Sequence, residues 1–232
     1  MNLNINKNEP VMVTGATGFV ASELIKKLLE NGITVHAAVR NPEDVSTLQH
    51  LTNLESTLSG EIIFFKSDLL EEESYLKSME GCSIVFHTAS PFNFKVKDNQ
   101  KGYINPALEG TRNVLDSVNK TESVKRVVLT SSCAAIYGDA VDISNYPNKT
   151  MTEEMWNPSS TSNYNAYSYS KTIAEKEAWD ISKKQNNWKL VVINPCFVLG
   201  PSISKNPTSG TFELLSQLAD GSMKSGAAPF EI

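Results

Sequence analysis

Short apolar runs alternate with amphipathic stretches along most of the chain. Six runs have the length and β-branched content of buried strands, and we expect strands at 11–13, 34–39, 62–65, 83–86, 126–130 and 190–193. Between them, apolar residues recur at helical spacing, which predicts helices over 19–30, 42–51, 71–79, 102–118 and 167–181. Pro106 suits only the first turn of its helix, so that helix is expected to begin near Asn105.

The order of these elements predicts the fold class. Strands alternate with helices, and the strand runs look apolar on both faces, which is typical of a parallel sheet covered by helices on both sides. We therefore expect a doubly wound α/β domain over residues 1–202. Residues 203–232 are rich in glycine and proline around one modest helical stretch at 212–218, and we expect them to form a small, partial substrate-binding region or a poorly ordered tail.

Composition narrows the classes of partner. The 232 residues carry a formal net charge of −5, which argues against nucleic acid and anionic membranes as partners. No run of 18 apolar residues occurs, and the three cysteines lie far apart, so neither a membrane span nor a disulfide framework or zinc site is indicated. These features favour a reduced, cytoplasmic protein with no metal, nucleic-acid or membrane partner.

The turn after the first predicted strand has a phosphate-binding pattern. Gly15, Gly18 and Ala21 follow the spacing G-x-x-G-x-x-A between strand and helix. Gly15 suits a tight turn, Gly18 lets the backbone approach a pyrophosphate, and Ala21 lets the helix pack closely on the strand. The same glycines would also suit a tight turn that binds nothing.

The ends of the next strands suggest which dinucleotide would bind. NAD-binding chains usually end the second strand with an acid, whereas this one ends with Arg40, whose guanidinium suits the 2′-phosphate of NADP. An ordinary surface arginine is the alternative. Asp68 and Leu69 follow the third strand, where they could reach an adenine, and Thr88 and Ser90 follow the fourth, beneath a ribose.

Tyr167 and Lys171 are four residues apart on a predicted helix and so share one face. A nearby ammonium lowers the pKa of a phenol, which makes the pair a candidate for proton transfer. Ser131 and Ser132 end the fifth strand, where a hydroxyl could polarise a substrate carbonyl. A tyrosine and a lysine four residues apart also occur by chance in helices. The pair indicates a site here because it occurs together with the glycine turn and the serines.

Together these motifs resemble the extended short-chain dehydrogenase/reductases, over nearly all of residues 9–201. Within that family the chain is similar to the branch of dihydroflavonol reductase, cinnamoyl-CoA reductase and yeast-type methylglyoxal/aldehyde reductases. The segments that carry the resemblance are 14–21, 39–40, 68–70, 86–91, 130–132, 167–171, 194–195 and 200–201.

The resemblance implies a role for each matched residue. Tyr167 would be the general acid, Lys171 its partner and a ribose ligand, and Ser132, rather than Ser131, the hydroxyl that orients the carbonyl. The cofactor NADP(H) would contact the remaining matched positions, which are Gly15, Phe19, Val20, Arg40, Pro195 and Val198. The implied activity is NADPH-dependent reduction of a small aldehyde or ketone, by a monomer or homodimer.

Three departures from the branch bear on the substrate and the cofactor. Tyr137 stands where flavonoid-reducing members have an asparagine, so we expect a substrate other than a flavonoid, with Phe92 and Tyr137 lining its pocket. Ser46 and Thr47 stand where a second basic residue is frequent, and family members continue beyond residue 232. A nucleotide-sugar epimerase or dehydratase that uses NAD, and a catalytically incomplete dinucleotide-binding fragment, remain the alternatives.

Overall fold

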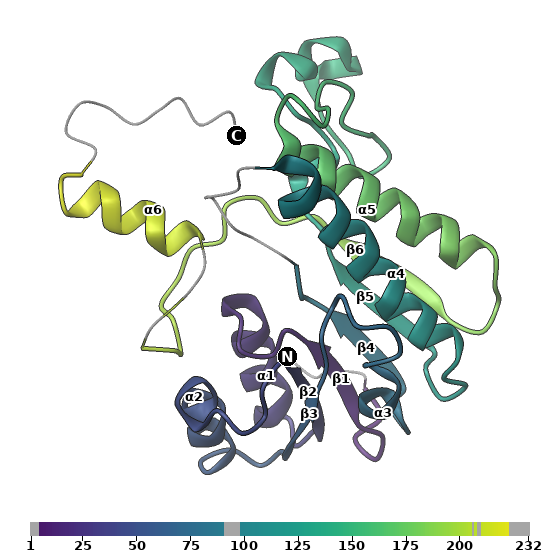
Figure 1. The fold of residues 1–232 in the computed structure, drawn as a ribbon, viewed down its shortest axis with the longest axis vertical. Helices are drawn as coiled ribbons and strands as arrows, with labels where there is room; N and C mark the ends of the chain where they lie inside the picture. Colours follow the sequence, from purple (N-terminus) through teal and green to yellow (C-terminus); the bar gives the residue numbers. More distant parts are fainter. Residues whose placement is uncertain (1–4, 91–97, 206, 208–209, 223–232) are drawn as a thin grey trace.

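The computed structural model describes residues 5–90, 98–205, 207 and 210–222, and its centre is a six-stranded parallel sheet (Figure 1). The strand order is β3-β2-β1-β4-β5-β6, so the chain winds outward from β1 first in one direction and then in the other. The strands are β1 Val11–Thr14, β2 Val35–Val39, β3 Ile62–Lys66, β4 Ile84–His87, β5 Arg126–Thr130 and β6 Lys189–Ile193. The predicted α/β class and all six strands are confirmed, each within a residue or two.

Helices cover both faces of the sheet and divide the core in two. The helices are α1 Phe19–Glu30, α2 Val45–Glu55, α3 Leu76–Met79, α4 Asn105–Asn119, α5 Ala166–Lys183 and α6 Gly210–Ala219. One core cluster joins α1 and α2 to β1 and β2, and the other joins α3, α4 and α5 to the opposite face. Figure 1 shows α1 and α2 together at one end of the sheet, and α4 beside α5 at the other.

The structure corrects three expectations. The helix expected over 71–79 is confined to α3, and α2 begins only at Val45, because the carboxylate of Asp44 caps it through the amides of Ser46 and Thr47. The edge strands β3 and β6 carry apolar residues on both faces but are not buried on both, because Ile63, Val191 and Ile193 are exposed. A π-helical turn, η1 Gln100–Ile104, precedes α4, which begins at Asn105 as expected.

Short 3₁₀ turns occupy the long connection between β5 and α5, where no element was expected. They are η2 Cys133–Ala135, η3 Ala140–Asn145 and η4 Pro147–Lys149. Asn157 ties this connection together, because its backbone N–H donates to the Ala135 carbonyl and its side-chain amide to the Ala134 carbonyl. The connection is therefore held close to the end of β5.

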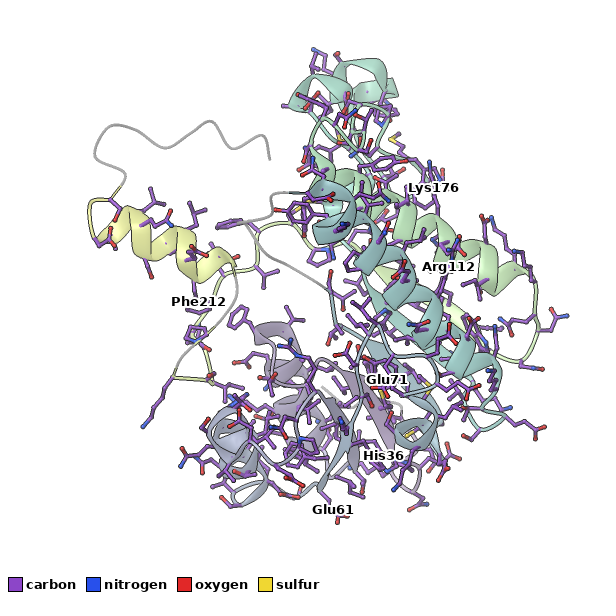
Figure 2. All side chains as sticks on the ribbon, in the orientation of Figure 1. His36, Glu61, Glu71, Arg112, Lys176 and Phe212 are labelled. Carbon is purple, nitrogen blue, oxygen red and sulfur yellow. The ribbon has the colours of Figure 1, made fainter. Side chains whose placement is uncertain are left out.

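The helix expected at 212–218 is confirmed as α6, which contacts the rest of the domain through an aromatic pair. Figure 2 shows Phe212 pointing from α6 toward α1. Its ring meets the ring of Phe19 edge to face, with 5.1 Å between the centroids. None of the helices in the described ranges has the length and apolar character needed to cross a bilayer.

Candidate active site

The site residues gather at the carboxyl edge of the sheet, where β1 and β4 lie side by side. The chain leaves β1 toward α1 on one face and leaves β4 toward α4 on the other. Such a switch point opens a crevice in which α/β proteins bind ligands. The ends of β1, β4, β5 and β6 and the first turns of α5 all contribute side chains there.

The glycine turn after β1 leaves room for a ligand and no room for a side chain. Gly15 has a φ of +60°, and a Cβ on it would lie 3.0 Å from the Cα and Cβ atoms of Ala89. Gly18 precedes α1 without a side-chain cap, and the first turn of α1 carries no acid. The positive end of this helix is therefore free of any side chain that would compete with a phosphate.

Thr14 joins the ends of β1 and β4. Its hydroxyl accepts the amide protons of Thr88 and Ala89, at 3.0 and 2.9 Å, and the Thr88 hydroxyl donates to the Thr14 carbonyl. With both lone pairs used, the Thr14 hydroxyl proton is left for Nδ1 of His87, 3.0 Å away. His87 then carries its proton on Nε2, and burial, helped by the nearby charge of Lys171, lowers its pKa to about 4. His87 is thus a neutral imidazole.

Lys171 is buried beneath the site. It is 8% exposed, and its ammonium donates to the hydroxyl of Ser90 at 2.6 Å. The same ammonium lies 5.6 Å from the centroid of the Tyr167 ring. Burial lowers the pKa of Lys171 to about 8, because the charged form is poorly solvated there.

Tyr167 is held as a protonated phenol. Burial raises its pKa to about 12, although a hydrogen bond with the Ser132 hydroxyl acts in the opposite direction. The expected lowering of this pKa by the ammonium of Lys171 is not seen, because the cost of desolvating a phenolate dominates. The phenol therefore keeps its proton more firmly than a free tyrosine does.

The two adjacent serines at the end of β5 point to different partners. The Ser132 hydroxyl interacts with Tyr167 and accepts the amide proton of Ala134 at 3.2 Å. The Ser131 hydroxyl turns inward and donates to the carboxylate of Glu175 at 2.5 Å. Of the two, Ser132 is the one that shares the space around the phenol.

Aromatic and thiol side chains surround the Tyr167 phenol. The Tyr103 ring lies 6.2 Å from the Tyr167 ring at a steep angle. The Tyr137 hydroxyl contacts the Cys133 thiol near Cys196, and burial raises the pKa of Tyr137 to about 12. Sequence reasoning missed Tyr103 and Cys196, which no local pattern marks, and Phe92 lies outside the described residues.

The outer positions expected to hold the cofactor follow the strands as predicted. Arg40 is exposed directly after β2, while the hydroxyl of Ser46 is engaged with the capping Asp44 at 2.6 Å. The Asp68 carboxylate accepts the Leu70 amide proton, and the Leu69 carbonyl accepts from Asn113 of α4.

The residues after β6 and at the start of α1 complete the rim of the site. Pro195 directly follows Asn194 and accepts the amide proton of Cys133 through its carbonyl, at 3.0 Å. Val198 lies half-buried further along. Phe19 is half-buried against Phe212, and Val20 is exposed beside it.

Comparison with known proteins agrees with this geometry. The model of the NAD dependent epimerase/dehydratase family matches residues 11–227. The chain belongs to this family. The predicted resemblance to extended short-chain dehydrogenase/reductases is confirmed.

Several similar proteins are reductases by name. Cinnamoyl-CoA reductase CAD2 of Medicago truncatula is 44% identical over 199 residues, which are 84% of this chain and 60% of that protein. Anthocyanidin reductase of Arabidopsis thaliana is 41% identical over 85% of this chain and 58% of its own length. The structure of yeast methylglyoxal/isovaleraldehyde reductase Gre2 complexed with NADPH aligns with a TM-score of 0.71 and 32% identity, over 83% of this chain and 59% of that one. The chain thus spans about three fifths of the length of these relatives.

Replacing Gly15 by alanine should weaken both folding and dinucleotide binding. The left-handed φ and the contact with Ala89 together are expected to cost about 2–3 kcal/mol of unfolding free energy, measured by urea denaturation. Gly81→Ala is the matched control, because Gly81 also has a positive φ of 73° but nothing lies within 4 Å of its added Cβ. That control should cost only about 1 kcal/mol and leave binding intact. Equal losses for the two variants would contradict the proposed close approach.

The buried Lys171 should make stability depend on pH in the alkaline range. Its pKa falls from 10.5 in the unfolded chain to about 8 in the folded one, so between these values the unfolded state binds more protons and stability rises with pH. Compared with Lys171→Met, the wild type should gain about 3 kcal/mol of unfolding free energy between pH 7 and pH 10.5, measured by urea denaturation at several pH values. Lys183→Met, at an exposed position on the same helix, is the control. A constant difference between wild type and Lys171→Met would disprove the assignment.

Proposed function

We propose that this protein reduces the carbonyl of a small aldehyde or ketone to an alcohol with NADPH. The observation that carries the proposal is the phenol of Tyr167, which is hydrogen-bonded to Ser132 and lies beside the buried ammonium of Lys171. Lys171 lines a small cavity with residues at the ends of β4 and β5, at the carboxyl edge of the sheet. The reductase relatives, one of them solved with NADPH, support the same reaction class.

The residues present fit a dinucleotide. A Cβ at Gly15 would fill the turn, and the N–H groups of Phe19 and Val20 at the start of α1 suit a pyrophosphate. The Gly18 N–H donates to the Gly15 carbonyl at 2.9 Å and so closes the turn. Arg40 would hold the 2′-phosphate of NADP, a pairing that guanidinium groups favour. The remaining contacts would come from Asp68 and Leu69 at the adenine, Thr88 and Ser90 at a ribose, Lys171 at the other ribose, and Pro195 and Val198 at the nicotinamide.

The chain's own residues would handle the carbonyl oxygen. NADPH, when bound, supplies the hydride that reaches the carbonyl carbon. Ser132 and Tyr167 would both donate hydrogen bonds to the oxygen, which orients the carbonyl and stabilises the charge that develops on it. Tyr167 would then transfer its proton to that oxygen, and the ammonium of Lys171 would stabilise the phenolate left behind.

The pocket around the phenol should select the substrate. Tyr103 presents aromatic surface to Tyr167, and Tyr137 contacts Cys133, whose thiol lies near the same phenol. Such walls suit an unsaturated or aromatic carbonyl compound of modest size. A cytoplasmic location and a monomeric or homodimeric state remain predictions from the sequence.

Removing the phenolic hydroxyl should abolish turnover without abolishing cofactor binding. We expect Tyr167→Phe to lower kcat/KM for aldehydes about 100- to 10,000-fold, because the proton donor is lost. The measurement is NADPH oxidation at 340 nm with a panel of aldehydes and ketones, beside a fluorescence titration of NADPH binding. Tyr169→Phe, two residues along the same helix, should keep its activity. Unchanged turnover in Tyr167→Phe, or tightly bound NAD in the purified protein, would contradict the proposal.

Neutralising Arg40 should reveal the cofactor preference. We expect Arg40→Ala to weaken NADPH binding about tenfold or more, because a charge-assisted contact of about 1.5–3 kcal/mol is lost, while NADH binding stays unchanged. Arg126→Ala is the control, because Arg126 begins β5 and so lies at the amino ends of the strands, away from the carboxyl ends where Arg40 lies. Equal weakening of both cofactors by Arg40→Ala would argue against a role at the 2′-phosphate.

A further inference from the structure

A buried carboxylate lies one helical turn beyond Lys171 and two turns beyond Tyr167. Glu175 is only 5% exposed, and its oxygens accept hydrogen bonds from three side chains. Oε2 accepts from the Ser131 hydroxyl at 2.5 Å and from the Asn194 amide at 2.7 Å, and Oε1 accepts from the Trp179 indole at 3.3 Å. All three partners are donors, which suits a carboxylate in its acceptor-only form.

These hydrogen bonds join α5 to the ends of two strands. Ser131 directly follows β5 and Asn194 directly follows β6. The Asn194 amide also donates its second proton to the backbone carbonyl of Ser132, at 3.1 Å. Because both of its partners are pure acceptors, the orientation of this amide is determined by the network.

Ser132 is held from both sides by this arrangement. The amide of Ser131 donates to the Ile193 carbonyl at 2.8 Å, and the amide of Cys133 donates to the Pro195 carbonyl at 3.0 Å. Beneath these backbone bonds, Asn194 holds the Ser132 carbonyl and Glu175 holds Asn194. Through Asn194, the backbone of Ser132 is thus linked to the Glu175 carboxylate.

We propose that Glu175 is a positioning residue, which acts through Asn194 and Ser131 to hold the Ser132 hydroxyl in line with Tyr167. This inference rests on the proposed function, since it assigns a purpose to Ser132 as the hydroxyl that orients the carbonyl. Helix α5 carries Tyr167, Lys171 and Glu175 on successive turns, so it sets the proton donor and, through Glu175, the orienting serine. The two groups that must meet one oxygen atom are thereby aligned by a single rigid element.

Charge compensation is the competing explanation. Glu175 and Lys171 line the same small cavity, together with His87, Ser90, Thr111 and Ser131. A negative charge there would offset the buried ammonium without positioning anything. A glutamine at this position would keep the oxygen acceptor and lose the charge. Positioning would survive this change, whereas charge compensation would not.

The first experiment compares Glu175→Gln with Glu175→Met. A glutamine oxygen in the place of Oε2 can still accept from Ser131 and Asn194, whereas methionine has similar length and no comparable acceptor. We expect Glu175→Met to lower kcat about 10- to 100-fold with little change in the KM for NADPH, and Glu175→Gln to stay within about threefold of wild type. Equal losses in the two variants would assign the role to the charge and overturn the proposal.

Glu177→Gln is the matched control on the same helix. Glu177 pairs with Arg112 of α4 at 2.7 Å on the outer surface, where Figure 2 shows Arg112 beside α5. The substitution removes a carboxylate of the same size from the same helix without touching β5 or β6. It should leave kcat unchanged.

A second variant decides the matter if Glu175→Met does not fold. Asn194→Ala removes the link to the Ser132 carbonyl and leaves Glu175 with two of its three donors. It should lower kcat about tenfold in the wild-type background and less than about twofold in a Ser132→Ala background, because the group being positioned is then absent. A loss of the same size in both backgrounds would show a general structural effect and overturn the proposal.

Amide hydrogen exchange separates this inference from the proposed function. The amides of Ser131 and Cys133 should exchange at least about tenfold faster in Asn194→Ala than in the wild type, and no faster in Glu177→Gln. If the wild type reduces no carbonyl with NADPH, the proposed function fails, and exchange alone then decides whether this network holds Ser132. Unchanged exchange in Asn194→Ala would overturn the positioning role whether or not the protein is a reductase.

Discussion

The hydrogen bonds of the Thr14 hydroxyl connect the ends of β1 and β4, and the rest of the site depends on this connection. The hydroxyl accepts two backbone amides from the segment after β4 and donates to His87, so the ends of the two central strands are held together by one side chain. All of these groups are buried or nearly so, where an unmet hydrogen bond costs more than in water. Two features of the site lie next to these hydrogen bonds. The glycine turn comes directly after β1, and Ser90, which accepts from Lys171, comes shortly after β4.

Two titratable side chains of the site, Lys171 and Tyr167, are buried where a charged form is poorly solvated. Burial pushes the pKa of Lys171 down and that of Tyr167 up, so both groups are held toward their neutral forms. A developing negative charge on a bound oxygen would change this balance, since it would favour the ammonium and draw the proton from the phenol. At neutral pH the buried ammonium of Lys171 lowers stability, whereas the protonated phenol of Tyr167 does not, so the expected cost of this site falls on Lys171.

Local patterns were enough to predict most of the fold. Apolar runs located all six strands, because a central parallel strand is buried on both faces and leaves a continuous apolar segment. The patterns were less informative at 71–79, where only Leu76–Met79 is helical, and over 133–149, where the 3₁₀ turns are held by distant side chains such as Asn157. In both places tertiary contacts, rather than local periodicity, determine the backbone.

By itself, the sequence determined the family, the α/β class and the placement of Tyr167 and Lys171 on one helix face, because these rest on residue type and short spacing along one element. The family resemblance also favoured Ser132 over Ser131, and the hydrogen bond of Ser132 with Tyr167 agrees with that choice. Only the tertiary structure showed that Thr14, His87, Glu175 and Asn194 lie close to these residues. Thr14 lies 73 residues from His87, and Ser131 lies 44 residues from Glu175. Such contacts arise only when the parallel strands bring their carboxyl ends to one edge of the sheet, and no spacing along the chain encodes them.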